Sequence, residues 1–113
     1  MAAPPARASS VLDALGDATR RELLAAVGAA GAEGTTATQL AVERSISRQA
    51  IVKHLQVLAA AGLVGAEKVG REQRYRLEPA PLADASAWLT SVGAAWDRRL
   101  ARLAESTSRR TAP

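Results

Sequence analysis

The spacing of hydrophobic residues predicts helices over most of the chain. Apolar side chains recur three and four positions apart, the period of an amphipathic helix, in two early clusters: Val11, Leu12 and Leu15, then Leu23, Leu24 and Val27. The first cluster predicts a short helix over Ser10–Leu15 that ends at Gly16. The second predicts a helix from Ala18 to about Ala29, capped by Asp17. Arg20 and Arg21 in its first turn oppose the helix dipole, so we expect a nearby carboxylate to pair with them.

A tight break separates two further predicted helices. The shorter one covers Ala37–Arg44, with a preceding threonine as its cap, and its apolar contacts are Leu40 and Val42. After a break at residues 45–46, a longer helix runs from its cap, Ser47, to about Ala61, where Gly62 supplies a left-handed stop. Two helices joined in this way are typical of a helix-turn-helix.

The longer helix has two different faces when its residues are placed about 100° apart. One face is suited to packing against the other helices and contains Ala50, Ile51, His54, Leu55 and Leu58. The opposite face is suited to contact with a partner and contains Arg48, Gln49, Val52, Lys53 and Gln56.

Two segments after Gly62 are predicted to be strands, and in the second of them Tyr75 and Leu77 share one face, as the period of two of a strand requires. Leu63–Val69 and Gln73–Leu77 are expected to form a hairpin around Gly70 and Arg71. The predicted fold is therefore mainly α with a small β-hairpin, a winged helix-turn-helix. It contains four helices, two strands and a last helix in that order.

The last predicted helix runs from Leu82 to about Glu105 and carries an apolar stripe. The three-four spacing of this stripe resembles that of a coiled coil, and its candidate interface residues are Leu82, Leu89, Val92, Trp96, Leu100 and Leu103. An exposed stripe of this kind favours a homodimer through the terminal helices. The alternative is that the helix packs on the first helix of its own subunit.

Length and composition indicate one domain without disulfides. We expect residues 10–105 to form the domain, residues 1–9 a flexible Ala/Pro/Ser-rich arm, and residues 106–113 a disordered tail. The 113 residues include no cysteine, which excludes disulfides and thiolate metal sites. The sequence contains neither a membrane-length apolar run nor a signal-peptide core, so we expect a cytoplasmic protein without a membrane partner.

Positive charge is concentrated in the predicted helix-turn-helix and hairpin. Residues 44–76 contain seven basic and two acidic residues, a net charge of +5, whereas the whole chain carries +4. The positive charge therefore coincides with the motif that would meet phosphate, which indicates double-stranded DNA as the partner.

The outer face of the longer helix supplies the candidate DNA contacts. Arginine can bind guanine, glutamine can bind adenine, and valine can contact a thymine methyl, so Arg48, Gln49 and Val52 are predicted to reach base edges. Ser47 and Lys53 are expected to hold phosphates. Gln49 and Gln56 are alternatively ordinary polar residues of an exposed helix.

The predicted hairpin adds a second set of candidate contacts. Arg71 at its tip is suited to the negative potential of a narrow minor groove, and the flanking residues suited to the DNA backbone are Lys68, Arg74 and Arg76. The alternative is that this tip is a solvated turn.

Three segments resemble winged-helix repressors of the ArsR/SmtB family: LGDATRRELL, SISRQAIVKHLQVLAAAGLV and VGREQRYRLEP. The resemblance covers about Leu12 to Leu103. It implies a homodimeric bacterial transcription factor, usually a repressor, whose terminal helices form the dimer interface. Metal-sensing members carry a cysteine pair or His-containing sets, whereas this chain has no cysteine and a single histidine, His54. We therefore expect no metal site and no cofactor.

The sequence thus predicts a DNA-binding transcriptional regulator, specifically a repressor that binds a palindromic operator as a homodimer. One alternative is a winged-helix module for protein interaction without specific DNA binding, and a second is non-specific DNA binding, as in a chromatin-type architectural protein. Enzymatic activity is not expected, because no catalytic motif is present at the required spacing.

Overall fold

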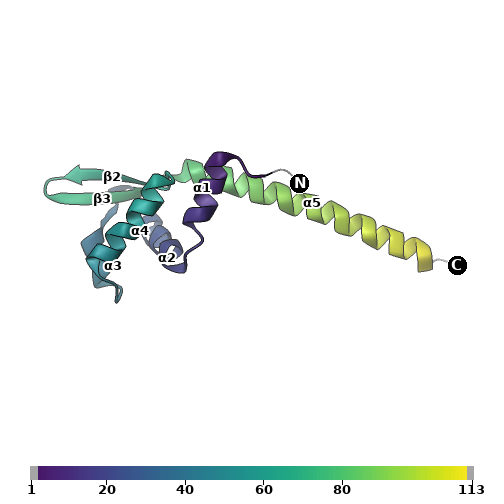
Figure 1. Ribbon diagram of the computed structural model, residues 1–113, viewed down its shortest axis with the longest axis horizontal. Helices are drawn as coiled ribbons and strands as arrows, with labels where there is room; N and C mark the ends of the chain where they lie inside the picture. Colours follow the sequence, from purple (N-terminus) through teal and green to yellow (C-terminus); the bar gives the residue numbers. More distant parts are fainter. Residues whose placement is uncertain (1–2, 112–113) are drawn as a thin grey trace.

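The computed structural model describes residues 3–111 and shows a small helical body from which one long helix projects (Figure 1). The elements in chain order are α1 (Ala6–Ala14), α2 (Ala18–Ala29), a 3-10 turn η1 (Gly31–Glu33), β1 (Thr35–Thr36), α3 (Ala37–Val42), α4 (Arg48–Ala60), β2 (Val64–Val69), β3 (Glu72–Leu77) and α5 (Pro79–Thr111). This order confirms the predicted winged helix-turn-helix and adds one short strand.

The first helix begins four residues earlier than the sequence indicated. α1 starts at Ala6 directly after Pro5, so it occupies part of the segment that we expected to be a flexible arm. Ala8 and Val11 are fully buried in this helix because α1 packs against α5. Residues 6–9 of the expected arm are therefore part of a packed helix.

Helix α2 has the predicted bounds and the predicted cap, since Asp17 accepts a hydrogen bond from the backbone N–H of Arg20. The expected nearby carboxylate exists for Arg20, because its charge helps to lower the pKa of Asp17, but neither guanidinium forms an ion pair with the described residues. Arg20 Nε donates to the carbonyl oxygen of Ala14 at 2.5 Å, and Arg21 donates to that of Leu15 at 2.8 Å. Both arginines bind carbonyl oxygens at the end of α1, which lack partners within that helix.

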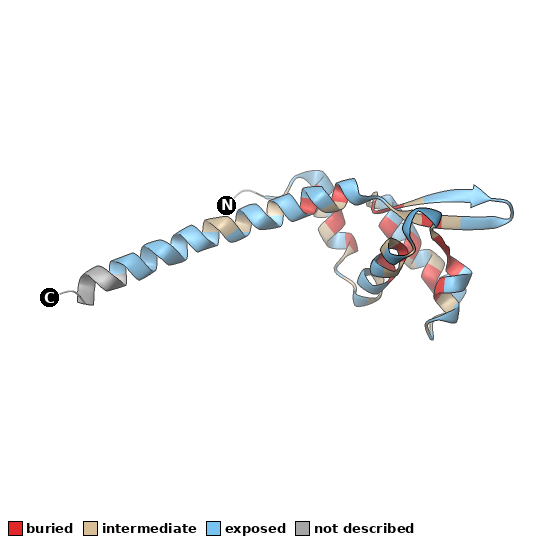
Figure 2. Cartoon of the chain, turned by 180° about the vertical axis from the view of Figure 1, so that it is seen from behind, coloured by how far each residue is buried: buried red, intermediate tan, exposed pale blue. Residues whose placement is uncertain are grey.

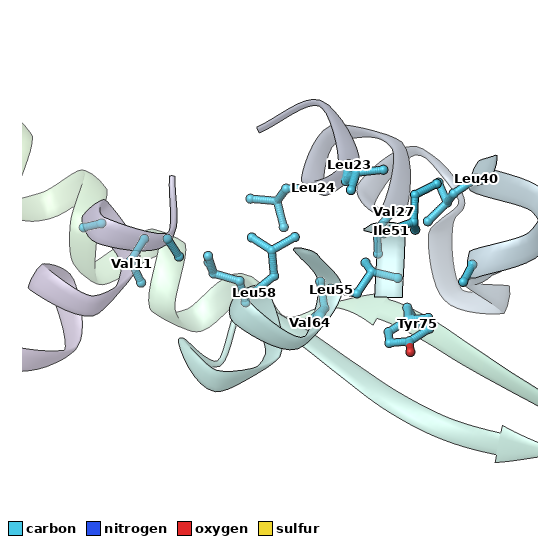
Figure 3. Close-up of a cluster of buried hydrophobic side chains, with 14 of the residues drawn as sticks. Val11, Leu23, Leu24, Val27, Leu40, Ile51, Leu55, Leu58, Val64 and Tyr75 are labelled. Carbon is cyan, nitrogen blue, oxygen red and sulfur yellow. The ribbon is translucent and has the colours of Figure 1, made fainter. Parts of the chain in front are cut away.

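The core lies between α2, α4 and the sheet, with α1 closing one side (Figure 3). Its largest fully buried side chains are Leu23, Ile51, Leu55, Leu58, Leu63, Val11 and Val27. All of them except Leu63 come from helices in which apolar residues repeat at helical spacing, which explains why the sequence pattern located these helices.

The wing belongs to a three-stranded antiparallel sheet in the order β1-β3-β2. Strands β2 and β3 pair from Val64 opposite Leu77 to Val69 opposite Glu72, as the predicted hairpin requires. The sequence pattern did not reveal β1, in which Thr35 pairs with Tyr75. Two residues are too few to display an alternating pattern, so this strand exists only because the chain meets β3.

Helix α3 ends at Val42, two residues before the predicted end, and the side chain of Arg44 donates to the carbonyl oxygen of Leu40. Leu40 is buried as expected. The predicted apolar contact of Val42 was wrong, because this side chain is 81% exposed on the outer side of the helix.

Helix α5 leaves the body and gives the molecule an extent of 75 Å along its longest axis (Figures 1 and 2). It continues to Thr111, so residues 106–111 of the expected tail are helical, and residues 112–113 lie outside the described residues. Among the described residues, no helix combines the length and hydropathy that a membrane crossing requires.

Candidate nucleic-acid interface

Helix α4 presents a buried back and a polar front. Ile51, Leu55 and Leu58 are fully buried against the core, as the helical pattern predicted. Ala50 and His54, which were also assigned to this face, are half-buried at its edges. Ser47 accepts a hydrogen bond from the backbone N–H of Ala50 and so fixes the start of the helix.

The predicted contact residues of α4 lie on its accessible side. The exposed members of this set are Ser47, Arg48, Gln49, Lys53 and Gln56. Val52 is half-buried, because part of its side chain packs against the core. The face therefore has four long polar side chains around one partly exposed apolar position, which is a composition suited to the floor of a major groove.

The hairpin of β2 and β3 extends from the body on the side opposite to α5 (Figure 1). Gly70 adopts a φ of 63°, the left-handed conformation that a tight turn needs, and Arg71 follows it at the tip. Arg71 and Lys68 are exposed. Among the described residues, neither of these side chains forms an ion pair or a hydrogen bond, so both cations are available to an outside partner.

Two other arginines of the wing are occupied by groups of the chain itself. Arg74 donates to the carbonyl oxygen of Glu33 at 3.2 Å and forms an ion pair with Glu72. Arg76 donates to the carbonyl oxygen of Ala32 at 2.6 Å and is paired with the carboxylate of Glu67. These contacts tie the loop before β1 to the sheet, which leaves Arg74 less free for DNA than the sequence suggested.

A hollow between α3, the start of α4 and the wing brings together residues that the sequence did not associate. Arg48 and Arg71 line this hollow with Thr36, Ala37, Thr38, Gln39, Glu72, Gln73 and Tyr75. Sequence reasoning had identified only Arg48 and Arg71. The sequence contains one signal for Thr38 and Gln39, which is that they follow a predicted capping threonine. They therefore lie in the first turn of a helix, and the start of that helix is near the next helix of the motif.

Asp17, the cap of α2, lies close to the buried side of α4. Its Oδ2 lies 4.0 Å from Nδ1 of His54. The hydrogen bond from the backbone N–H of Arg20 is the main cause that lowers the pKa of Asp17 from 3.8, and the charges of Arg20 and His54 act in the same direction. His54 is thus a contact between two helices on the side away from the exposed face.

The described side chains include no group of three or more His, Cys, Asp or Glu residues that could hold a metal ion. Among the described residues, Asp17 is the one ion-pair partner of His54. That the protein uses no metal cofactor stays a prediction.

The geometry and the sequence both match known transcription regulators. A family model described as a helix-turn-helix domain matches residues 15–64. An ArsR-like transcriptional regulator from Rhodococcus sp. RHA1 is 47% identical over 88% of this chain and 92% of that chain, with a TM-score of 0.74. The chain belongs to the ArsR family.

Other solved structures agree with this membership. An ArsR family transcriptional regulator is 28% identical, with a TM-score of 0.72, over 86% of this chain and 97% of that chain. A possible transcriptional regulator for arsenical resistance is 38% identical, with a TM-score of 0.66, over 84% of this chain and 93% of that chain. A comparison with curated proteins found no match. This ArsR-family protein is therefore a DNA-binding transcriptional regulator with a winged helix-turn-helix.

Proposed function

We propose that this ArsR-family protein is a repressor that binds a palindromic operator as a homodimer. The observation that carries the proposal is the set of free cations on α4 and the wing. Arg48, Lys53, Lys68 and Arg71 are exposed, and none forms an ion pair with the described residues. Binding that releases counterions from DNA needs cations of this kind.

The reading surface is the exposed face of α4 with the tip of the wing. Gln49 and Val52 lie near the start of α4, where a recognition helix reaches base edges. Ser47, Lys53 and Gln56 flank them and are suited to the backbone, as is Lys68 on β2. Arg74 has a structural role in this proposal because its guanidinium already binds Glu33 and Glu72.

The dimer is supported by the uncovered part of α5. Leu89, Trp96, Leu100 and Leu103 are between 48% and 62% exposed along this helix. Leu82 instead packs partly against its own core, and Ala85 is buried there, so the start of the stripe serves the subunit itself. Val92, between Leu89 and Trp96 in the distal part, is half-buried. A second copy that covers the distal stripe would also match the two-fold symmetry of a palindrome.

Selection of bound duplexes from a random library tests the function directly. We expect one inverted-repeat sequence to be enriched, with half-sites about one helical turn apart. The affinity for this sequence should fall steeply with salt because several phosphates are neutralised. An affinity that is independent of salt would favour the protein-interaction module, whereas salt-dependent binding without any enriched sequence would favour non-specific DNA binding.

Two variants of α4 separate base reading from backbone binding. Gln49→Ala should relax the preference at one base pair in each half-site by about 1–3 kcal/mol. Lys53→Gln should weaken all sequences equally and reduce the salt dependence by about one phosphate contact. Library selection with each variant measures both effects, and unchanged discrimination in Gln49→Ala would remove this residue from the reading surface.

A further inference from the structure

We propose that the hollow between α3, the start of α4 and the wing binds one phosphodiester of the DNA backbone. Arg48 and Arg71 are its cationic ligands, and Thr38 and Gln39 are additional hydrogen-bond donors. This inference rests on the proposed DNA binding. It assigns Arg48 to a phosphate rather than to a base, and Arg71 to the same phosphate rather than to the minor groove, which differs from the expectations drawn from the sequence.

The position of the hollow follows from the geometry of a duplex. With α4 in a major groove and the tip of the wing in the adjacent minor groove, the strand that separates the two grooves must pass between these elements. The hollow is lined by residues of α3, α4 and β3 together with Arg71 at the hairpin tip. A backbone phosphate is therefore the part of the duplex that this hollow would face.

The side chain of Arg48 is held toward the hollow by Thr38. Arg48 Nε donates to Oγ1 of Thr38 at 3.3 Å, while the remaining guanidinium nitrogens have no partner among the described residues. Because the threonine oxygen acts as the acceptor in this bond, its own hydrogen stays available. Both side chains line the hollow, so both can donate to an oxygen placed there.

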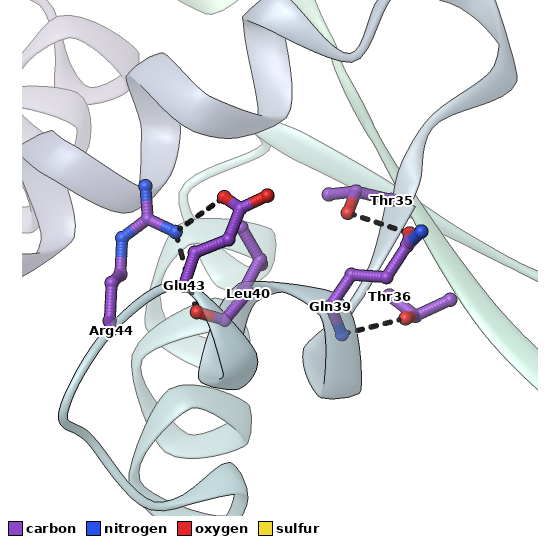
Figure 4. Close-up of polar contacts among 6 residues, drawn as sticks. All are labelled: Thr35, Thr36, Gln39, Leu40, Glu43 and Arg44. Carbon is purple, nitrogen blue, oxygen red and sulfur yellow. Dashed lines mark hydrogen bonds and ion pairs between the residues drawn. The ribbon is translucent and has the colours of Figure 1, made fainter.

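The side chain of Gln39 is oriented by the strand before α3 (Figure 4). Thr35 Oγ1 donates to Oε1 of Gln39 at 3.2 Å, and the backbone N–H of Gln39 donates to Oγ1 of Thr36. The carbonyl oxygen of the amide is thus occupied and its NH₂ group remains. The NH₂ group in this orientation can donate hydrogen bonds to a phosphate oxygen, which can only accept them.

The charge and size of the hollow suit a phosphate. Two arginines line it, and Glu72, the one carboxylate among its lining residues, forms an ion pair with Arg74 at 3.2 Å. The net charge that an incoming anion meets in the hollow is therefore positive. The volume of the hollow is about 270 Å³, which is below the roughly 300–1,000 Å³ of pockets for drug-sized ligands. The hollow nevertheless has room for a single phosphate group.

Methylphosphonate linkages test the assignment in the full-length protein. A duplex with the selected site would carry one neutral methylphosphonate at each phosphate position in turn. We expect one position per half-site where the neutral linkage weakens the wild type by roughly tenfold or more. Arg48→Gln and Arg71→Gln should each weaken binding of the unmodified duplex, yet bind this modified duplex within about twofold of the wild type.

Two controls keep the result specific. Thr38→Val, which loses the hydroxyl, should weaken binding without any change in base preference. Arg98→Gln removes a charge on α5, away from the hollow, and should change neither the affinity nor the base preference. The assignment is overturned if Arg48→Gln alters the preferred base at one position, or if every modified duplex weakens variant and wild type equally. Failure to enrich any sequence would refute the proposed function itself, a different outcome.

Discussion

At the scale of single residues, polar side chains fix the ends of the helices that build the reading surface. Asp17, Thr36 and Ser47 each accept a backbone hydrogen bond at the start of a helix. Such a cap satisfies an N–H group that has no partner in the first turn. Asp17 has a second contact, because its carboxylate also lies near His54 on the back of α4.

The lowered pKa of Asp17 predicts how its contribution to stability depends on pH. A carboxylate whose pKa is lower in the folded state stabilises the protein above its unfolded pKa, and this contribution is lost as the pH falls through the folded value. The loss should therefore begin near the ordinary value of 3.8 and be complete below the lowered one. Replacement of Asp17 by Ala should lower the melting temperature at pH 7, with a smaller difference from the wild type in acid.

Thermal unfolding from pH 7 to pH 2.5 measures this effect, with Asp97→Asn as the control, because Asp97 is an exposed carboxylate on α5. The control should follow the wild type at each pH. A difference between Asp17→Ala and the wild type that stays constant down to pH 2.5 would contradict the prediction.

At the scale of elements, a glycine allows the loop before α3 to approach the wing closely. Gly34 adopts φ 74° and ψ −172°, a region that is essentially restricted to glycine. A Cβ at this position would lie 2.6 Å from the carbonyl oxygen of Tyr75 on β3. The close approach lets β1 pair with β3 and brings α3 against the wing.

Substitution of two neighbouring glycines tests this account. Gly34→Ala should destabilise the protein by about 3 kcal/mol, since it combines backbone strain with a clash against β3. Gly31 also has a positive φ of 68°, but a Cβ there would meet nothing within 4 Å. Gly31→Ala should therefore cost only about 1 kcal/mol.

Urea denaturation of both variants gives the comparison. Equal losses of unfolding free energy would show that the contact with Tyr75 contributes nothing beyond the conformation of the loop. Because the Gly34 contact holds the wing to α3, that variant should also bind the selected duplex more weakly.

At the scale of the whole molecule, α5 divides into two parts with different surroundings. Its beginning packs on α1, where Ala85 is buried and Asp84 forms an ion pair with Arg7 at 3.2 Å. Beyond this region its stripe faces outward, and the guanidinium of Arg99 lies 5.5 Å from the centre of the Trp96 ring. An apolar stripe of this length on a projecting helix is typical of a surface that another chain covers.

Polar substitutions on the distal stripe test the dimer. The double variant Leu89→Ser with Trp96→Ser should raise the dimer dissociation constant by at least about a hundredfold, since it removes two large apolar contacts. Light scattering at micromolar concentration should then report the monomer mass, and binding should weaken most on the complete palindrome.

Val42→Ser is the matched control for this experiment, because it also changes an exposed apolar residue but lies on α3. It should keep the mass of the wild type. A double variant with unchanged mass would place the interface elsewhere, without any effect on the reading surface of α4.

The sequence by itself determined most of the elements and several of their ends. The apolar spacing located α2 and α4, and the caps at Asp17 and Ser47 were found where the sequence indicated them. The sequence also predicted the turn at Gly70, which adopts a positive φ in the structure. These features depend on contacts within one or two turns of the chain, and such contacts leave a periodic pattern or a characteristic residue.

Only the tertiary structure decided which side chains are free and which are occupied. Arg76 binds the carbonyl oxygen of Ala32, 44 residues away, and Arg74 binds that of Glu33, whereas Arg71 between the same strands remains available. The hollow that joins Thr38 and Arg48 to Arg71 has the same origin. Backbone carbonyls carry no residue-specific signal and distant segments share no period, so the partners of these arginines became visible only in the folded chain.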